Sequence, residues 1–153
     1  MINLIGTYEC KLDTKGRFML PISLKKQLNE EVTKGFVLKK SIFQPCLELY
    51  TIAEWNLILS KIRRLNPFKR RNKDFIRKFT AGIKLLDIDS TGRILIPKDL
   101  MQPAGLEKDI IITSTVNCIE IWNNEYYYKE ISHDLENFAD LTQEIMGNNQ
   151  ELL

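Results

Sequence analysis

The chain has 153 residues, 44% of them hydrophobic, and a formal net charge of +2 at pH 7. This length and apolar content suit one compact domain or two small intertwined halves, and they exclude a disordered protein. No apolar run reaches the roughly 18 residues that a membrane span requires, and the N-terminus lacks the pattern of a secretory signal, so we expect a cytoplasmic protein.

The charges are unevenly distributed along the chain. Residues 61–78 carry nine basic side chains against Asp74 alone, whereas the residues after Ile119 carry eight acidic side chains against Lys129 alone. A basic centre with an acidic end is typical of a protein with a polyanionic partner, but a solvated helix face gives the same pattern. Charge alone leaves both interpretations open.

A nine-residue stretch occurs twice, 76 positions apart. Residues 13–21 read Asp-Thr-Lys-Gly-Arg-Phe-Met-Leu-Pro, and residues 89–97 read Asp-Ser-Thr-Gly-Arg-Ile-Leu-Ile-Pro. Asp, Gly, Arg and Pro recur in register, and chance agreement is improbable because each type makes up about one residue in twenty. The repeat therefore indicates an internal duplication.

Each copy of the repeat predicts a tight reversal between two strands. An Asp at the first position of a type I turn accepts hydrogen bonds from the following backbone amides, and a Gly at the fourth position takes a positive φ without a steric clash. The chain is therefore expected to turn at residues 14–15 and 90–91. In the strand that follows each turn, Arg17 or Arg93 lies opposite the core face. The residues expected on the core face are Phe18, Leu20, Ile94 and Ile96.

The first half of the chain predicts four short strands and a helix. Residues 7–12 alternate loosely and would form a hairpin with residues 17–20. A short helix is expected after Pro21, because proline fits the first turn of a helix and cannot donate to a strand ladder. The two further strands are expected at 36–39 and 47–50.

A pair of helices is expected to link the halves. Apolar spacing between Glu54 and Leu65 predicts one amphipathic helix, and Asn66-Pro67 is expected to end it and to cap the next, whose apolar stripe begins at Phe68. The outward face of the pair holds most of the basic side chains. Five of them are candidate phosphate contacts: Arg63, Arg64, Lys69, Arg70 and Arg71.

The second half repeats the plan with one difference. Pro103 would break a helix that begins at Lys98, so a single turn is expected there, with Gly105-Leu106 entering the next strand. Residues 126–138 are expected to form a last amphipathic helix, and residues 147–153 are expected to be disordered. The expected strands are 83–88, 93–96, 109–113 and 118–122.

An enzyme would require a catalytic constellation that the sequence does not show. His133 is the only histidine, and no Gly-x-Ser-x-Gly motif or phosphate-binding loop accompanies it, so we expect neither an enzyme nor a cofactor. The three cysteines are widely spaced and include no Cys-x-x-Cys, which argues against a disulfide framework or a zinc cluster. Asp87 and Asp89 lie on a strand and in a turn, so no metal site is expected.

The motifs together resemble the MraZ family. Tandem Asp-x-x-Gly-Arg-x-x-x-Pro units are each followed by a Cys-Leu-Glu-Leu-Tyr or Cys-Ile-Glu-Ile-Trp strand, and Arg63-Arg64-Leu-Asn-Pro and Arg70-Arg71 lie between them. The resemblance covers about residues 6–128 and implies a strand-rich α+β fold. In that fold, two AbrB-like swapped-hairpin β-barrel halves, related by internal duplication, are joined by a helical pair. The implied divisions are 7–53 and 82–125 for the halves, 54–80 for the linker, and 126–153 for an acidic helix and tail.

The resemblance also implies a function. Members of the family are bacterial transcription factors associated with the division and cell-wall gene cluster, and they assemble into rings that bind G-rich direct repeats in double-stranded DNA. Their DNA-facing hairpin matches six positions of this sequence: Lys15, Gly16, Arg17, Thr91, Gly92 and Arg93. Thr91 stands where Lys15 stands in the first copy, so the second turn has one fewer positive charge. The implied partners are DNA and further copies of the chain, without a membrane, and the implied location is the nucleoid.

The chemistry of the turns suits this role, but alternatives exist. Arginine can place two donors on the acceptor atoms of guanine, and a two-stranded ribbon fits the major groove. Lys15 and the basic linker would supply attraction to phosphate. Alternatively, Arg17 and Arg93 form salt bridges to Asp13, Asp89 or a carboxylate at a sheet edge. A second candidate function is an antitoxin-like swapped-hairpin module whose acidic tail binds a basic protein.

Overall fold

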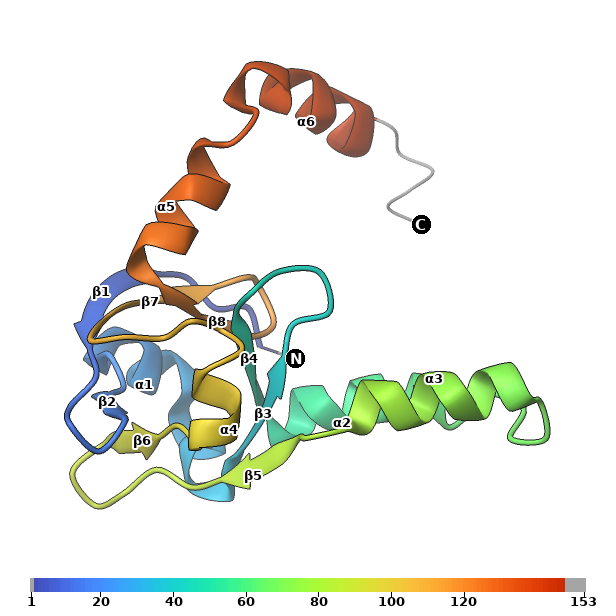
Figure 1. Ribbon diagram of the computed structural model, residues 1–153, viewed down its shortest axis with the longest axis horizontal. Coiled ribbons are helices and arrows are strands. Elements are labelled where there is room, and N and C mark those ends of the chain that lie inside the picture. Colours follow the sequence, from blue (N-terminus) through green and yellow to red (C-terminus); the bar gives the residue numbers. More distant parts are fainter. Residues whose placement is uncertain (1, 148–153) are drawn as a thin grey trace.

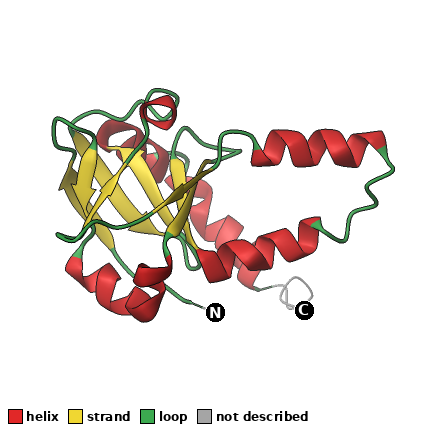
Figure 2. Ribbon diagram, turned by 90° about the horizontal axis from the view of Figure 1, so that it is seen from below, coloured by secondary structure: helices red, strands yellow, loops and turns green. Residues whose placement is uncertain are grey.

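Strands from both halves of the chain alternate in one central sheet. The computed structural model describes residues 2–147, and its six-stranded antiparallel sheet has the order β1-β7-β8-β4-β3-β5 (Figure 1 and Figure 2). These strands are β1 (Thr7–Lys11), β3 (Phe36–Lys40), β4 (Leu47–Thr51), β5 (Lys84–Leu86), β7 (Asp109–Ser114) and β8 (Ile119–Asn123). A separate two-stranded ladder joins β2 (Arg17–Met19) to β6 (Arg93–Leu95). The strand-rich α+β fold expected from the sequence is confirmed.

The prediction that residues 7–12 form a hairpin with residues 17–20 is wrong. β1 instead pairs with β7, and β2 pairs with β6, so that each strand of the repeat finds its partner in the other half. The swap allows Phe18 and Ile94 to pair directly and to be buried together. The burial of these two side chains stabilises the ladder by removing their apolar surface from water. This is the swapped-hairpin arrangement that the family resemblance implied.

Residues at equivalent positions of the two halves meet at the centre of the fold. Phe18 pairs with Ile94 in the β2–β6 ladder, and Glu48 pairs with Glu120 in the β4–β8 ladder. The two halves are therefore related by an approximate twofold axis that passes through both pairs. The duplication seen in the sequence thus appears as symmetry in the structure.

Two short helices close the core under the strands. α1 (Ile22–Leu28) and α4 (Lys98–Met101) begin directly after Pro21 and Pro97, as predicted. Leu24 of α1 and Leu100 of α4, which occupy equivalent positions in the two halves, are both buried. The largest apolar cluster also contains all four residues expected on the core face: Phe18, Leu20, Ile94 and Ile96.

The chain after α4 forms the single helical turn and the stop that the sequence predicted. Gly105 takes a φ of 61° and donates its N–H to the carbonyl of Gln102, and Leu106 N–H bonds to the carbonyl of Met101. This left-handed glycine ends the helical turn and does not begin a strand. The strand expected over residues 109–113 follows as β7, which begins at Asp109, and Gly105 and Leu106 belong to the turn that leads into it.

A helical arm formed by α2 (Ile52–Ile62) and α3 (Arg70–Thr80) projects from the sheet (Figure 1 and Figure 2). The Phe79 ring stacks on the Trp55 ring at 5.9 Å between centroids, which attaches α3 to α2. The prediction that Asn66 caps the second helix is wrong, because its side chain accepts from the N–H of Phe68 within the loop. Phe68 consequently lies outside α3 and is 95% exposed.

A second arm follows β8. In place of one helix over residues 126–138, the chain forms α5 (Asn124–Ser132), a short 3-10 turn η2 (Leu135–Asn137) and α6 (Phe138–Met146). The break occurs at Asp134, which has a left-handed φ of 55°. The disorder predicted for residues 147–153 concerns mostly positions 148–153, which lie outside the described residues. Between residues 2 and 147, no helix is both long and apolar enough to cross a bilayer.

Candidate nucleic-acid interface

The first tip, residues 13–17, is held together by one carboxylate. Asp13 Oδ1 accepts from the backbone N–H groups of Lys15 and Arg17, each at 2.9 Å, and Oδ2 accepts from Arg17 Nε at 2.8 Å. Gly16 N–H donates to the Asp13 carbonyl at 3.0 Å, and Gly16 has a φ of 85°. The predicted turn is confirmed, and only glycine takes this φ without strain.

The second tip, residues 89–93, repeats this clamp and adds a hydroxyl. Asp89 Oδ1 accepts from the N–H groups of Thr91 and Arg93 at 2.9 Å, and also from Thr91 Oγ1 at 2.8 Å. Arg93 Nε donates to Asp89 Oδ2 at 3.2 Å and to Thr91 Oγ1 at 2.8 Å. The Thr91 hydroxyl is therefore part of the clamp that holds the arginine.

The clamps lower the pKa values of both turn carboxyls. The pKa of Asp89 falls from 3.8 to about 2, chiefly because the Arg93 backbone N–H and the Thr91 hydroxyl donate to the charged form. The pKa of Asp13 is lowered as well, first by the backbone N–H of Arg17. Both carboxylates are thus ionised at neutral pH, which keeps the tips rigid.

The salt-bridge alternative for the two arginines is realised in the structure. Arg17 and Arg93 each use Nε to bind the aspartate of their own turn. Within residues 2–147, no hydrogen bond engages the terminal nitrogens of either guanidinium group. Each clamp therefore fixes the side chain and leaves its two terminal nitrogens as donors for a partner. An arginine held in this way loses little entropy when it binds a planar acceptor pair.

The β2–β6 ladder brings the two arginines onto one ribbon. Arg17 pairs with Leu95 and Arg93 pairs with Met19, so the outer face carries the two arginines at diagonally opposite corners, each beside an apolar side chain. Met19 and Leu95 are both 51% exposed, although the neighbouring core positions are buried. The ladder thus presents a two-stranded surface of the width that fits a major groove.

The structure does not bring the basic arm to these tips. Figure 1 shows α3 and its preceding loop at one end of the molecule, and β2 and β6 at the other. α3 has no buried residue, and the only ion pair that it forms within residues 2–147 joins Arg77 to Asp74 at 3.1 Å. The arm side chains predicted as phosphate contacts are Arg63, Arg64, Lys69, Arg70 and Arg71. Within one protomer, the five arm side chains and the two tips are therefore too far apart to form a single contact surface.

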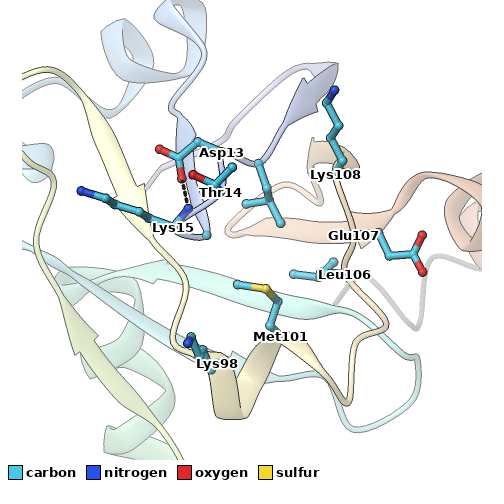
Figure 3. Close-up of a pocket in the computed structure, with 10 residues that line it drawn as sticks. Asp13, Thr14, Lys15, Lys98, Met101, Leu106, Glu107 and Lys108 are labelled. Atoms are coloured by element: carbon cyan, nitrogen blue, oxygen red, sulfur yellow. Dashed lines mark hydrogen bonds between the residues drawn. The ribbon is translucent and has the colours of Figure 1, made fainter.

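A cleft of about 660 Å³ lies beside the first tip. Its apolar floor is formed by Leu12, Met101 and Leu106. Figure 3 shows Lys15 and Lys98 on one side of Met101 and Lys108 on the other, with Lys15 N–H bonded to Asp13. Lys98 adds a positive charge beside the first tip that the sequence motif did not indicate, because it comes from α4 and not from the turn.

The remaining candidates considered from the sequence do not form a reactive site. His133 is exposed at the end of α5. In the part of the chain that the structure describes, no three His, Cys, Asp or Glu side chains are grouped to hold a metal ion. Burial raises the pKa of Cys46 to about 12 and that of Cys118 to about 11, so both thiols stay protonated.

The duplicated swapped hairpin, with a clamped arginine at each tip, defines the class of tandem swapped-hairpin proteins. Within that class the chain belongs to the MraZ family: the family model described as MraZ protein, antitoxin-like, matches residues 4–78 and again residues 79–149. The resemblance found in the sequence is confirmed.

Relatives of the chain are named transcriptional regulator MraZ. One from Flavobacterium psychrophilum is 55% identical over 97% of this chain and 94% of its own length. One from Christiangramia forsetii is 53% identical over 97% of this chain and 96% of its own length. One from Clostridium botulinum is 36% identical over 86% of this chain and 92% of its own length. The chain is thus a member of a family of transcriptional regulators and not of an enzyme family.

Proposed function

We propose that this protein regulates transcription by binding double-stranded DNA through the two tips of the β2–β6 ladder. The observation that carries the proposal is the aspartate clamp, which fixes Arg17 and Arg93 through Nε and leaves their terminal nitrogens as donors. Two parallel donors match the O6 and N7 acceptors of guanine in the major groove. A G-rich target follows from this chemistry, and G-rich direct repeats upstream of a division and cell-wall gene cluster follow from the family resemblance.

Phosphate contacts would come from other residues. Lys15 is exposed on the first turn and has no carboxylate within ion-pair distance in the described chain. The backbone N–H groups of Gly16 and Gly92 are used within the turns, so these glycines contribute close approach of the backbone and not a donor. The basic arm would contact phosphate further along the DNA. Such contacts add affinity without reading sequence.

We also propose that the protein binds DNA as a homo-oligomer, in agreement with the ring that the family resemblance implies. Both helical arms leave apolar side chains uncovered by their own chain. On α6, Phe138, Leu141 and Ile145 follow one another at helical spacing and are 60%, 48% and 42% exposed. On the other arm, Phe75 is 46% exposed. Because the two arms differ, a contact between an arm of one copy and the other arm of the next would be head-to-tail, and such contacts form a ring where the rotation between copies closes.

An antitoxin-like protein-binding module is the second candidate. The α5–α6 arm favours it, because this arm is acidic, amphipathic and without a buried residue. Size-exclusion chromatography with and without duplex DNA separates the two functions. A regulator comigrates with the duplex, whereas the module elutes unchanged.

The direct test of the proposed function is a mobility-shift assay. Its probe is a duplex taken from upstream of the protein's own gene, and its competitor is a scrambled duplex of the same length and composition. We expect the scrambled competitor to displace the probe only at a large excess. Equal displacement by both duplexes would contradict sequence-specific binding.

A further inference from the structure

The glycine of each tip lies against side chains that come from the other half of the chain. A methyl group placed on Gly92 would lie 3.4 Å from Met19 Sδ and 3.6 Å from Lys25 Nζ. A methyl group placed on Gly16 would lie 2.6 Å from Met101 Cε and 4.0 Å from Leu95 Cδ1. Each tip is therefore contacted by one strand side chain and one helix side chain of the opposite copy.

The helix side chains occupy equivalent positions but differ in charge. Met101 lies 76 positions after Lys25, which is the spacing of the duplication. The same spacing relates Lys15 to Thr91. The first tip thus has a lysine in its turn and a methionine beneath it, as Figure 3 shows, and the second tip has a threonine in its turn and a lysine beneath it.

The ammonium group of Lys25 is bound neither by the Thr91 hydroxyl nor by a carboxylate of the described chain. The Thr91 hydroxyl already donates to Asp89 and accepts from Arg93, so it serves the clamp. Lys25 is exposed, and no ion pair or side-chain hydrogen bond engages its Nζ within residues 2–147. An ammonium group with no partner beside a clamped arginine has the arrangement of a phosphate contact next to a base contact.

We propose that Lys25 is a DNA-phosphate contact of the second tip and takes there the role that Lys15 has at the first. Each tip then has one guanine-reading arginine and a lysine for the adjoining phosphate, although the two lysines come from different elements. The inference rests on the proposed DNA binding. It also supplies, from α1, the positive charge that the second turn lacks where Thr91 stands in place of a lysine.

A structural role must be separated from this one. Lys25 and Lys26 both lie in the last turn of α1, where a lysine stabilises the negative end of the helix dipole. Lys26 is also exposed in the last turn of α1, but none of its atoms is among those nearest to Gly92. Lys26→Ala is therefore the matched control for Lys25→Ala.

The test measures the salt dependence of binding to the upstream duplex and to its scrambled version. Each phosphate contact contributes about 0.9 to the slope of log affinity against log salt, which is a roughly threefold difference between 50 and 200 mM. We expect Lys25→Ala to reduce the slope on both duplexes by about this amount for each 89–93 tip that binds DNA. Lys26→Ala should leave the slope unchanged. Adding Thr91→Lys to Lys25→Ala should restore the slope.

The outcomes distinguish the inference from the proposed function. Equal slopes for Lys25→Ala and Lys26→Ala overturn the role of Lys25, provided that Arg17→Ala and Arg93→Ala still lose preference for the upstream duplex. If the arginine variants also bind as the parent does, the proposed function itself fails. Thermal melting of each variant shows whether a reduced slope reflects unfolding, in which case the Thr91→Lys double variant decides.

Discussion

Glu48 and Glu120 lie directly opposite each other in the β4–β8 ladder, on the twofold axis that relates the two halves. Glu48 has a cation nearby, because Lys39 Nζ lies 3.5 Å from its carboxylate. Among the residues that the structure describes, the side chain of Glu120 accepts from a neutral donor alone, Trp122 Nε1 at 2.8 Å. Burial raises the pKa of Glu120, and the charge of Glu48 raises it further, although the hydrogen bond from Trp122 opposes the shift. The duplication has thus placed two like charges face to face.

We predict that Glu120→Gln increases the free energy of unfolding at pH 7 by about 0.2 to 1 kcal/mol, the range measured for charged cross-strand pairs. The folded protein holds the Glu120 proton more tightly than the unfolded chain, so the protonated carboxyl carries no penalty below the ordinary pKa of 4.5, and stability is lost as the pH rises and the group ionises. The gain should therefore shrink in acid. Urea unfolding at pH 7 and at pH 4 measures both values.

Glu48→Gln is the matched control and should have the opposite effect. It removes the carboxylate beside Lys39, whose side chain is only 5% exposed. An ammonium group buried without its counter-ion is strongly destabilising. Equal stabilisation by both substitutions would show that the repulsion is shared and that Lys39 does not distinguish the two carboxylates.

Some of this structure was predictable from the sequence because its causes are local. The Asp13 turn, the positive φ of Gly16 and the outward direction of Arg17 depend on residues within a few positions of one another, and all three were predicted. The pairing of β2 with β6 was not, because alternation shows which face of a strand is buried but not which strand lies beside it. The family resemblance supplied that information.

The candidate site shows the same division. The residues of each turn were found from the motif, but Lys25 and Lys98 come from helices that the swapped topology places beside the tips. The spacing of 76 residues between Lys25 and Met101 was the available signal. It becomes informative only when the contacts between the halves are known.

We predict that the second tip keeps its conformation down to low pH. Because the pKa of Asp89 is lowered to about 2, the stability that its clamp contributes is complete above the ordinary pKa of 3.8 and is lost as the pH falls through about 2. NMR titration of the side-chain carboxyl carbon would report this pKa. In Asp89→Asn, Arg93 should become mobile, and its Nε–H signal should broaden at neutral pH. A titration midpoint near 4 would contradict the clamp.

Removal of residues 133–153 should leave the fold intact and strengthen nonspecific DNA binding. The cut follows α5, whose contacts remain: Tyr127 packs on Trp122 at 5.8 Å between ring centroids, and Tyr128 Oη donates to Glu9 at 2.8 Å. The deletion removes five carboxylates that compete with phosphate for the basic surface. Because the deletion also removes α6 and its proposed oligomer contacts, binding to scrambled duplex at low salt is compared with that of the Leu141→Ser, Ile145→Ser variant, which lacks those contacts but keeps the carboxylates. Unchanged affinity would reject the competition, and loss of the melting transition would show that the arm is structural.

The oligomer should depend on the apolar row of α6. Replacing Leu141 and Ile145 with serine removes its central contacts, and light scattering at micromolar concentration should then give a smaller mass than that of the parent. Thr142→Ser changes the same helix without altering the row and is the control. A parent protein that is already a monodisperse monomer would remove the proposed ring.

Arg17 and Arg93 should determine sequence preference, and Lys15 should not. If each arginine reads a guanine, Arg17→Ala or Arg93→Ala should cost roughly 1 to 3 kcal/mol per engaged tip and relax the preference at one base position. Arg17→Lys should fail in the same way, because a lysine cannot place two parallel donors while a third nitrogen holds the aspartate. Lys15→Ala should instead weaken upstream and scrambled duplexes alike, with a slope of log affinity against log salt lower by about one unit per contact. Arginine variants that melt normally and still discriminate as the parent does would make the tips structural and the basic arm the leading candidate for DNA binding.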